Sequence, residues 1–151
     1  MATYTESEKE NIQAMFWYYK LLDDNDVEGM REFFDPGFIT RTHDWQHADG
    51  TPMKGPEVII ALAAMLHGAL SNLRTYGFEH IMADGPKVSF WAWQEGINDG
   101  LGFLMGQPPT GAPWRIRIAH VIYFRGDTKK PYLHDAVRDD KIAVDVHGKQ
   151  Q

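Results

Sequence analysis

Apolar residues in the first part of the chain recur every three or four positions, which is the spacing of one face of an α-helix. Thr5-Glu6-Ser7-Glu8 has the pattern of a capping box, in which a threonine and the glutamate three residues later satisfy free backbone N–H groups. We therefore expect a first helix over residues 6–22. Its apolar positions are Ile12, Met15, Phe16, Tyr19 and Leu22.

Two further helices show the same spacing. Polar residues 23–26 end the first helix, and Asp26 can cap a short second helix that stops before Asp35-Pro36-Gly37. Residues 38–42 are β-prone and residues 43–54 are predicted to form a loop. Gly55-Pro56-Glu57 then places a proline in a first helical turn, which predicts a third helix over residues 56–72. The apolar positions are Val27, Met30, Phe33 and Phe34 in the second helix, and Ile59, Ala63, Leu66 and Leu70 in the third.

From residue 74 onward the apolar period shortens to two, as in half-buried strands. The predicted strands cover residues 74–82, 87–97, 114–125 and 132–144, and turn-forming glycine, proline and aspartate separate them. Helices followed by strands predict an α+β fold, with the helices on one face of an antiparallel sheet. We expect a single domain over residues 1–151, with its core at about 5–146.

Composition narrows the class of protein. The chain has 151 residues, of which 43% are hydrophobic and none is cysteine, so disulfides and thiolate chemistry are excluded. Its net charge of -6, with dispersed lysines and arginines, argues against nucleic acid as a partner. The longest apolar stretch, residues 58–66, is about half of the roughly 20 residues that span a bilayer. The N-terminus has no basic region followed by an apolar run. We expect a soluble, cytoplasmic protein without membrane partners.

The order of these elements resembles the SnoaL-like polyketide cyclase family of the nuclear-transport-factor-two-like superfamily. Two segments carry the resemblance, Asp35-Pro36-Gly37-Phe38-Ile39 and Gly106-Gln107-Pro108-Pro109-Thr110-Gly111, the second followed by an alternating strand. The resemblance runs from about residue 12 to residue 139. It implies a cone-shaped, curved antiparallel sheet wrapped by three helices around an apolar pocket, and a homodimer formed through the open sheet face.

The family's relatives include cyclases, steroid isomerases, dehydratases, epoxide hydrolases and proteins without catalysis, so the fold does not choose a reaction. The family's last strand usually carries an acidic-x-Trp pattern. Here that pattern is replaced by Tyr132-Leu133-His134-Asp135-Ala136-Val137-Arg138-Asp139, which shifts the expected catalytic position by a residue or two.

Three residues on the last two strands are the main candidates for acid/base chemistry. His120 alternates with apolar residues on one strand face and is either a satisfied core histidine or a pocket acid/base. On the last strand, Asp135 shares a face with Leu133 and Val137, whereas His134 points the other way. We predict that Asp135 faces the cavity, where apolar neighbours would raise the pKa of its carboxyl. A solvated aspartate at the sheet edge is the alternative.

His43 is a further candidate, placed by the resemblance at the pocket mouth; a surface loop histidine is the alternative. His43 and His47 lie four apart, as zinc ligands on a helix do, but the segment is predicted as strand end and loop, so we expect no metal. No phosphate-binding or dinucleotide motif is present, and no cofactor is expected. Large apolar side chains could form a wall for a flat ligand or belong only to the core. The candidate substrate-binding residues are Tyr19, Phe16, Trp91, Phe90, Ile118, Ile122 and Leu66.

These candidates lead to an expected reaction. A cofactor-independent enzyme would use Asp135, helped by His120, to remove a proton beside a carbonyl of a hydrophobic, polyketide-like molecule and drive an intramolecular aldol-type ring closure. An isomerase, dehydratase or epoxide hydrolase acting on a terpenoid or steroid-like substrate is the first alternative. A non-catalytic small-molecule binding module is the second.

Overall fold

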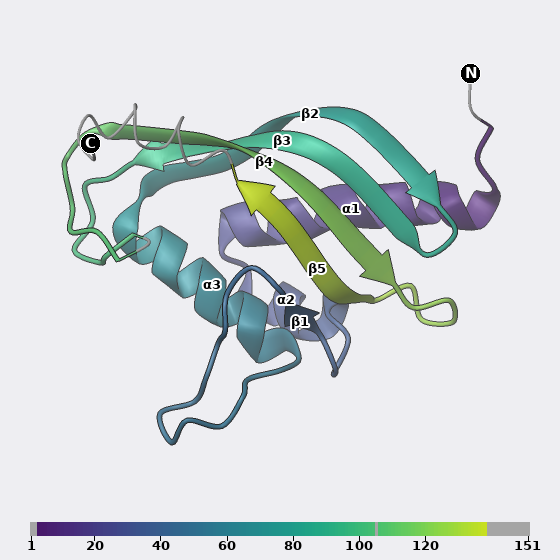
Figure 1. Ribbon diagram of the computed structural model, residues 1–151, viewed down its shortest axis with the longest axis horizontal. Coiled ribbons are helices and arrows are strands. Elements are labelled where there is room, and N and C mark those ends of the chain that lie inside the picture. Colours follow the sequence, from purple (N-terminus) through teal and green to yellow (C-terminus); the bar gives the residue numbers. More distant parts are fainter. Residues whose placement is uncertain (1–2, 105, 139–151) are drawn as a thin grey trace.

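The computed structural model describes residues 3–104 and 106–138 and has the predicted α+β fold (Figure 1). Within these residues no helix has both the length and the apolar character that crossing a bilayer requires. The helices are α1 (Glu6–Asp24), α2 (Val27–Phe33) and α3 (Pro56–Ala69). The strands are β1 (Ile39–Thr40), β2 (Ser71–Asp84), β3 (Lys87–Ile97), β4 (Pro113–Phe124) and β5 (Pro131–Arg138).

The five strands form one curved sheet in the order β1-β5-β4-β3-β2. Strands β2 to β5 pair antiparallel, but β1 pairs parallel with β5, so the prediction of a purely antiparallel sheet is wrong at this edge. A segment of two residues leaves little periodicity from which its direction could be predicted. Figure 1 shows the sheet bent over the three helices, which lie on its concave side. This arrangement is the expected cone.

Local sequence signals explain most element ends. Thr5 accepts a hydrogen bond from the backbone N–H of Glu8, whose side chain accepts one from the backbone N–H of Thr5, so the predicted capping box is confirmed. Helix α1 continues to Asp24 and stops at Asn25, which adopts a left-handed conformation. Helix α3 ends at Ala69 and not at residue 72, because the backbone is extended at Leu70 and β2 starts directly afterwards. The predicted strand over 132–144 is observed to Arg138, and residues 139–144 lie outside the described part of the chain.

Strands β3 and β4 alternate strictly between buried and partly exposed residues over most of their lengths. Even-numbered positions of both strands face the helices, so Phe90 of β3 lies opposite His120 of β4 on the inner face. Met15 and Tyr18 of α1 and Ala63 of α3 are fully buried in the same cluster. The hydrophobic effect thus fixes which face of each strand can reach an interior site.

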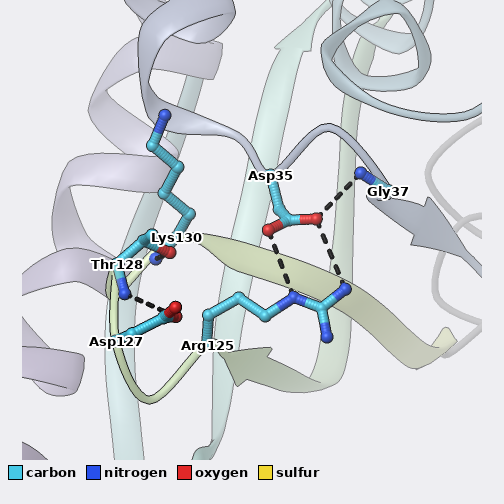
Figure 2. Close-up of polar contacts among 6 residues, drawn as sticks. All are labelled: Asp35, Gly37, Arg125, Asp127, Thr128 and Lys130. Carbon is cyan, nitrogen blue, oxygen red and sulfur yellow. Dashed lines mark hydrogen bonds and ion pairs between the residues drawn. The ribbon is translucent and has the colours of Figure 1, made fainter.

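An ion pair fixes the start of β1 next to the β4–β5 turn. Asp35 accepts hydrogen bonds from Arg125 Nε at 3.1 Å and from the backbone N–H of Gly37 at 2.8 Å (Figure 2). Burial raises the pKa of Asp35, but the hydrogen bonds from Arg125 and Gly37 outweigh it and lower that pKa below its usual value. The backbone N–H of Asp35 also donates to the carbonyl of Pro131, the first residue of β5. The pair therefore aligns β1 with β5.

Candidate active site

A cavity of about 380 Å³ lies between the concave face of the sheet and helices α1 and α3. This volume is in the range of small-molecule sites. Its apolar wall consists of Leu22, Leu62, Met65, Leu66, Leu104, Trp114, Ile116, Ile118 and Ala136. Its polar and aromatic lining consists of Tyr18, Tyr19, Thr42, His43, Trp45, Gln94, His120, His134 and Arg138, with Gly106 completing the boundary. Such a cavity favours a hydrophobic ligand that carries a few polar groups.

Two buried histidines contact each other at the cavity wall. His120 Nδ1 and His134 Nε2 are 2.9 Å apart and share a hydrogen bond. The strand register explains the contact: His120 pairs with Ala136 across β4 and β5, so His134, two residues earlier on β5, is its diagonal neighbour on the same face. The ring of Phe90 stacks on His120 with a centroid distance of 4.8 Å. The sheet therefore holds both imidazoles in fixed orientations.

Hydroxyl groups extend this contact in two directions. The Tyr19 hydroxyl lies 3.0 Å from His120 Nδ1, and the Thr40 hydroxyl lies 2.9 Å from His134 Nδ1. Thr40 reaches His134 because the two residues are paired in the parallel register of β1 and β5. Thr40 Oγ1 is in turn 2.8 Å from Thr42 Oγ1, and Thr42 is exposed.

Burial keeps both imidazoles neutral at physiological pH. It lowers the pKa of His134 to about 4, although nearby Asp135 raises it slightly. It also lowers the pKa of His120 well below its usual value, and the neighbouring His134 lowers it further. Two neutral imidazoles that share a hydrogen bond need one N–H and one bare nitrogen. The tautomer of one ring therefore determines the tautomer of the other.

The second ring nitrogen of His120 is the group available to a ligand. The side chain of His120 makes both of its hydrogen bonds through Nδ1, and within residues 3–104 and 106–138 no group forms a hydrogen bond with Nε2. His120 is one of the residues that line the cavity. If Nδ1 carries the hydrogen, Nε2 presents a lone pair; if Nδ1 is bare, Nε2 presents an N–H. The same atom can thus accept or donate a proton.

Some of the residues singled out from the sequence line the cavity, and others do not. Those that do are His120, His134, His43, Tyr19, Leu66 and Ile118. Phe90 and Ile122 are buried next to the site without lining it. Phe16 is partly exposed and packs on Phe78 instead. Trp91 lies on the outer face of the sheet beneath the guanidinium of Arg117, because odd-numbered positions of β3 point away from the helices.

The prediction that Asp135 faces the cavity is wrong. The side chain of Asp135 is 46% exposed and lies 3.9 Å from Arg41 Nη1, on the face of β5 opposite His134. The prediction relied on Leu133 and Val137 as markers of the inner face, but Val137 is 70% exposed. Pairing of β5 with β4 decides the face, and it turns His134 inward opposite Ile122.

Gln94 and Thr40 are site residues that were not predicted from the sequence. Gln94 is buried, lines the cavity and pairs with Ile116, two inward positions along β4 from His120. Its alternation in phase with Phe90 and Ala92 was a usable signal, since an amide in an apolar row needs a partner. Thr40 gave no such signal, because its contact with His134 depends on the parallel pairing of β1.

The two histidines of the loop after β1 have different neighbours. The ring of His43 packs against Trp45 at the cavity rim, whereas His47 lies 3.6 Å from Glu57 Oε2. In the described part of the chain, no three histidine, cysteine, aspartate or glutamate side chains come together as a metal site would require. Among the described residues that line the cavity, the side chains that can transfer a proton at neutral pH are those of histidine and tyrosine.

The curved sheet over three helices, with a cavity between them, defines the cone-shaped α+β fold that the family resemblance implied. The sequence matches the SnoaL-like polyketide cyclase family over residues 12–129, most of the chain, and the protein belongs to that family. No curated protein sequence matches it.

Solved structures share the fold at low sequence identity. A candidate SnoaL-like polyketide cyclase from Jannaschia sp. CCS1 is 18% identical, with a TM-score of 0.76 over 99% of this chain and 100% of that one. IdmH from Streptomyces antibioticus, a candidate polyketide cyclase, is 19% identical, with a TM-score of 0.71 over 92% and 99%. AclR from Streptomyces galilaeus, a candidate hydroxylase, is 16% identical, with a TM-score of 0.71 over 95% and 99%. Because candidate cyclases and a candidate hydroxylase share the fold, the reaction has to be argued from the site.

Proposed function

We propose that the protein is an acid/base enzyme that closes a ring in a hydrophobic, polyketide-like molecule by an intramolecular aldol-type reaction. One observation carries the proposal: a neutral, buried histidine, His120, lines an apolar cavity with one ring nitrogen bonded and the other without a partner in the described chain. Family membership supports a cyclisation. The role that the sequence suggested for Asp135 passes to His120, since Asp135 lies outside the cavity.

The chemistry needs one group that both takes and returns a proton. His120 Nε2 removes a proton from a substrate carbon flanked by carbonyl groups, which leaves an enolate. The enolate carbon attacks a second carbonyl carbon of the same molecule, a carbon–carbon bond forms, and the carbonyl oxygen becomes an alkoxide. The alkoxide takes the proton back from His120 Nε2. The product is an isomer of the substrate, and atoms and protons balance without a cofactor.

Two further cavity residues are suited to orient the substrate. Burial raises the pKa of Tyr19 well above its usual value, so its phenol keeps its hydrogen and can donate it to a substrate oxygen. Gln94 supplies an amide at a second point along the inner face of the sheet. Between them, apolar side chains hold the molecule in a folded shape, which replaces entropy that would otherwise be lost at the barrier.

The acid/base step can be tested with a simple probe, 2-tetralone deuterated at its benzylic α-carbon. This flat bicyclic ketone has an acidified carbon like that of a polyketide, and loss of deuterium to water is followed by mass spectrometry. We expect the wild type to exceed the buffer rate and His120→Gln to lose about a hundredfold or more of that excess. His80→Asn is the matched control, because His80 is exposed on β2 and its positive φ suits asparagine.

The outcomes separate the alternatives. Deuterium loss that depends on His120 supports an acid/base enzyme. A probe that raises the unfolding midpoint but loses no deuterium would contradict the proposal and favour a binding module. Equal deuterium loss in wild type and a folded His120→Gln variant would remove His120 as the base.

A further inference from the structure

A continuous row of hydrogen-bonding groups leads from the inner wall of the cavity to its exposed rim. It starts at His120, passes through His134 and Thr40, and ends at Thr42, which is exposed. The three successive contacts measure 2.9, 2.9 and 2.8 Å. Each neutral imidazole has one N–H and one bare nitrogen, and each hydroxyl both donates and accepts. Every member can therefore take a proton on one side while releasing one on the other.

Proton transfer along this row would avoid an unfavourable charge on His120. A proton placed on His120 Nε2, with no other change, would create an imidazolium next to Phe90 and Tyr19, away from water. Burial and the neighbouring His134 oppose this charge, since both lower the pKa of His120. A base that must ionise in this place would be a weak one. If a second proton leaves Nδ1 as the first arrives at Nε2, no charge builds up.

We propose that His134, Thr40 and Thr42 form a proton relay that lets His120 accept and return the substrate proton without becoming charged. The inference rests on the proposed acid/base function of His120. It assigns to His134 and Thr40 the role of positioning residues, which set the tautomer of His120 and do not touch the substrate carbon.

The proton movements balance in each direction. The substrate proton arrives at His120 Nε2, and the hydrogen on His120 Nδ1 moves to His134 Nε2. The hydrogen on His134 Nδ1 moves to Thr40 Oγ1, the hydrogen of Thr40 moves to Thr42 Oγ1, and that of Thr42 passes to water. Both histidines stay neutral and exchange one tautomer for the other. The reverse sequence returns a proton from His120 Nε2 to the alkoxide, while the hydrogen on His134 Nε2 moves back to His120 Nδ1.

Thr40→Val tests the relay because valine keeps the β-branched shape and removes only the hydroxyl; Thr40→Ser is the matched control that keeps it. The first measurement is the ¹⁵N spectrum of histidine-labelled protein without ligand. Valine leaves a buried His134 Nδ1–H without an acceptor, which is costly. We therefore expect His134 to keep its hydrogen on Nε2 and His120 to shift toward the Nε2–H tautomer, with serine restoring the wild-type spectrum. An unchanged His120 spectrum in Thr40→Val would overturn the relay, because the tautomers would then not be coupled through Thr40.

The second measurement is deuterium loss from labelled 2-tetralone. We expect Thr40→Val to lower the maximal rate by about tenfold or more with KM nearly unchanged, and Thr40→Ser to stay within about threefold of wild type. A coupled spectrum with a full rate in Thr40→Val would overturn the use of the relay in turnover and leave the proposed function intact. A coupled spectrum with no deuterium loss in wild type would contradict the proposed function instead, while the tautomer coupling itself would stand. His134→Gln, which removes the central member, should reproduce the rate loss if valine at residue 40 prevents folding.

Discussion

At the residue scale, the site depends on two histidines that burial keeps uncharged. A solvated imidazole is half protonated near pH 6.5, and the protonated half cannot act as a base. Here the pKa of His134 is lowered to about 4, and that of His120 is also lowered well below its usual value. Burial thus makes His120 a weaker base, but it also leaves the lone pair of His120 unprotonated over the whole physiological range.

The lowered pKa of the buried imidazole predicts an unusual pH–rate profile. A base is active when unprotonated, so activity is lost as the pH falls through the folded-state pKa. We expect kcat/KM for deuterium loss from 2-tetralone to be flat from about pH 8 down through pH 6.5, where a solvated imidazole would already be half protonated. The decline should come only at lower pH, because burial and the neighbouring His134 lower the pKa of His120 well below its usual value. Circular dichroism at each pH would confirm that the protein stays folded. A half-maximal rate near pH 6.5 would show that burial does not lower the pKa of the base.

At the element scale, the site is built by one long strand pair and one short edge strand. The β4–β5 register brings His120 and His134 together, and the parallel β1 brings Thr40 to His134. The position of β1 in turn depends on the ion pair of Asp35 with Arg125 (Figure 2). A partly buried ion pair between sequence-distant segments is therefore linked through β1 to the acid/base groups.

Asp35→Asn should weaken this connection. Asparagine keeps the size of the side chain but loses the charge that Arg125 and the Gly37 N–H stabilise, so we expect a lower unfolding midpoint and looser pairing of β1 with β5. The maximal rate of deuterium loss should also fall, by less than the roughly tenfold expected for Thr40→Val, because the Thr40 hydroxyl is still present. Hydrogen exchange of the Arg41 amide, which donates to the His134 carbonyl, reports the pairing. Unchanged exchange at this amide would show that the ion pair does not hold β1.

The spacing of apolar residues predicted the elements with many regular repeats. It failed where strand pairing determines the direction of a strand or the face that is buried. Helix α1 and strands β3 and β4 follow from their spacing, and the alternation around Ile118 and Ile122 correctly turned His120 inward. On β5, apolar residues occur on both faces, so the sequence pattern does not show which face is buried. We predicted that Asp135 faces the cavity, but the pairing of β5 with β4 turns His134 inward instead. The parallel direction of β1 could not be predicted, since two residues carry no period and tertiary contacts alone place them.

At the scale of the whole molecule, the lowered pKa of a buried histidine makes the free energy of unfolding depend on pH. Above about pH 6.5 His134 is neutral in the folded and unfolded states alike. Between about 6.5 and about 4 the unfolded chain binds a proton that the folded protein does not, so stability falls as the pH falls through this window. The loss for His134 alone is about 3 kcal/mol in order of magnitude, at about 1.4 kcal/mol per pH unit.

The homodimer implied by the resemblance stays a prediction.

Urea unfolding of wild type and His134→Gln between pH 7.5 and pH 4 measures this linkage. We expect His134→Gln to be less stable at neutral pH, because it replaces a packed imidazole and its hydrogen bonds. Its stability should also fall less steeply as the pH is lowered, because one depressed pKa has been removed. Parallel pH dependences for the two proteins would show that His134 is not held neutral by folding.

Ring closure itself tests most directly whether His120 is the base of a cyclase. The substrate would be an aromatic bicyclic ketone that carries a β-keto ester side chain long enough to close a six-membered ring. Its aldol product has the same mass as the substrate and is separated from it by chromatography. We expect ring closure by the wild type without added cofactor and a nearly full rate for Asp135→Asn, whose carboxylate lies outside the cavity. We expect closure to be lost in a folded His120→Gln variant. Closure that survives in His120→Gln and disappears in Asp135→Asn would contradict this role of His120.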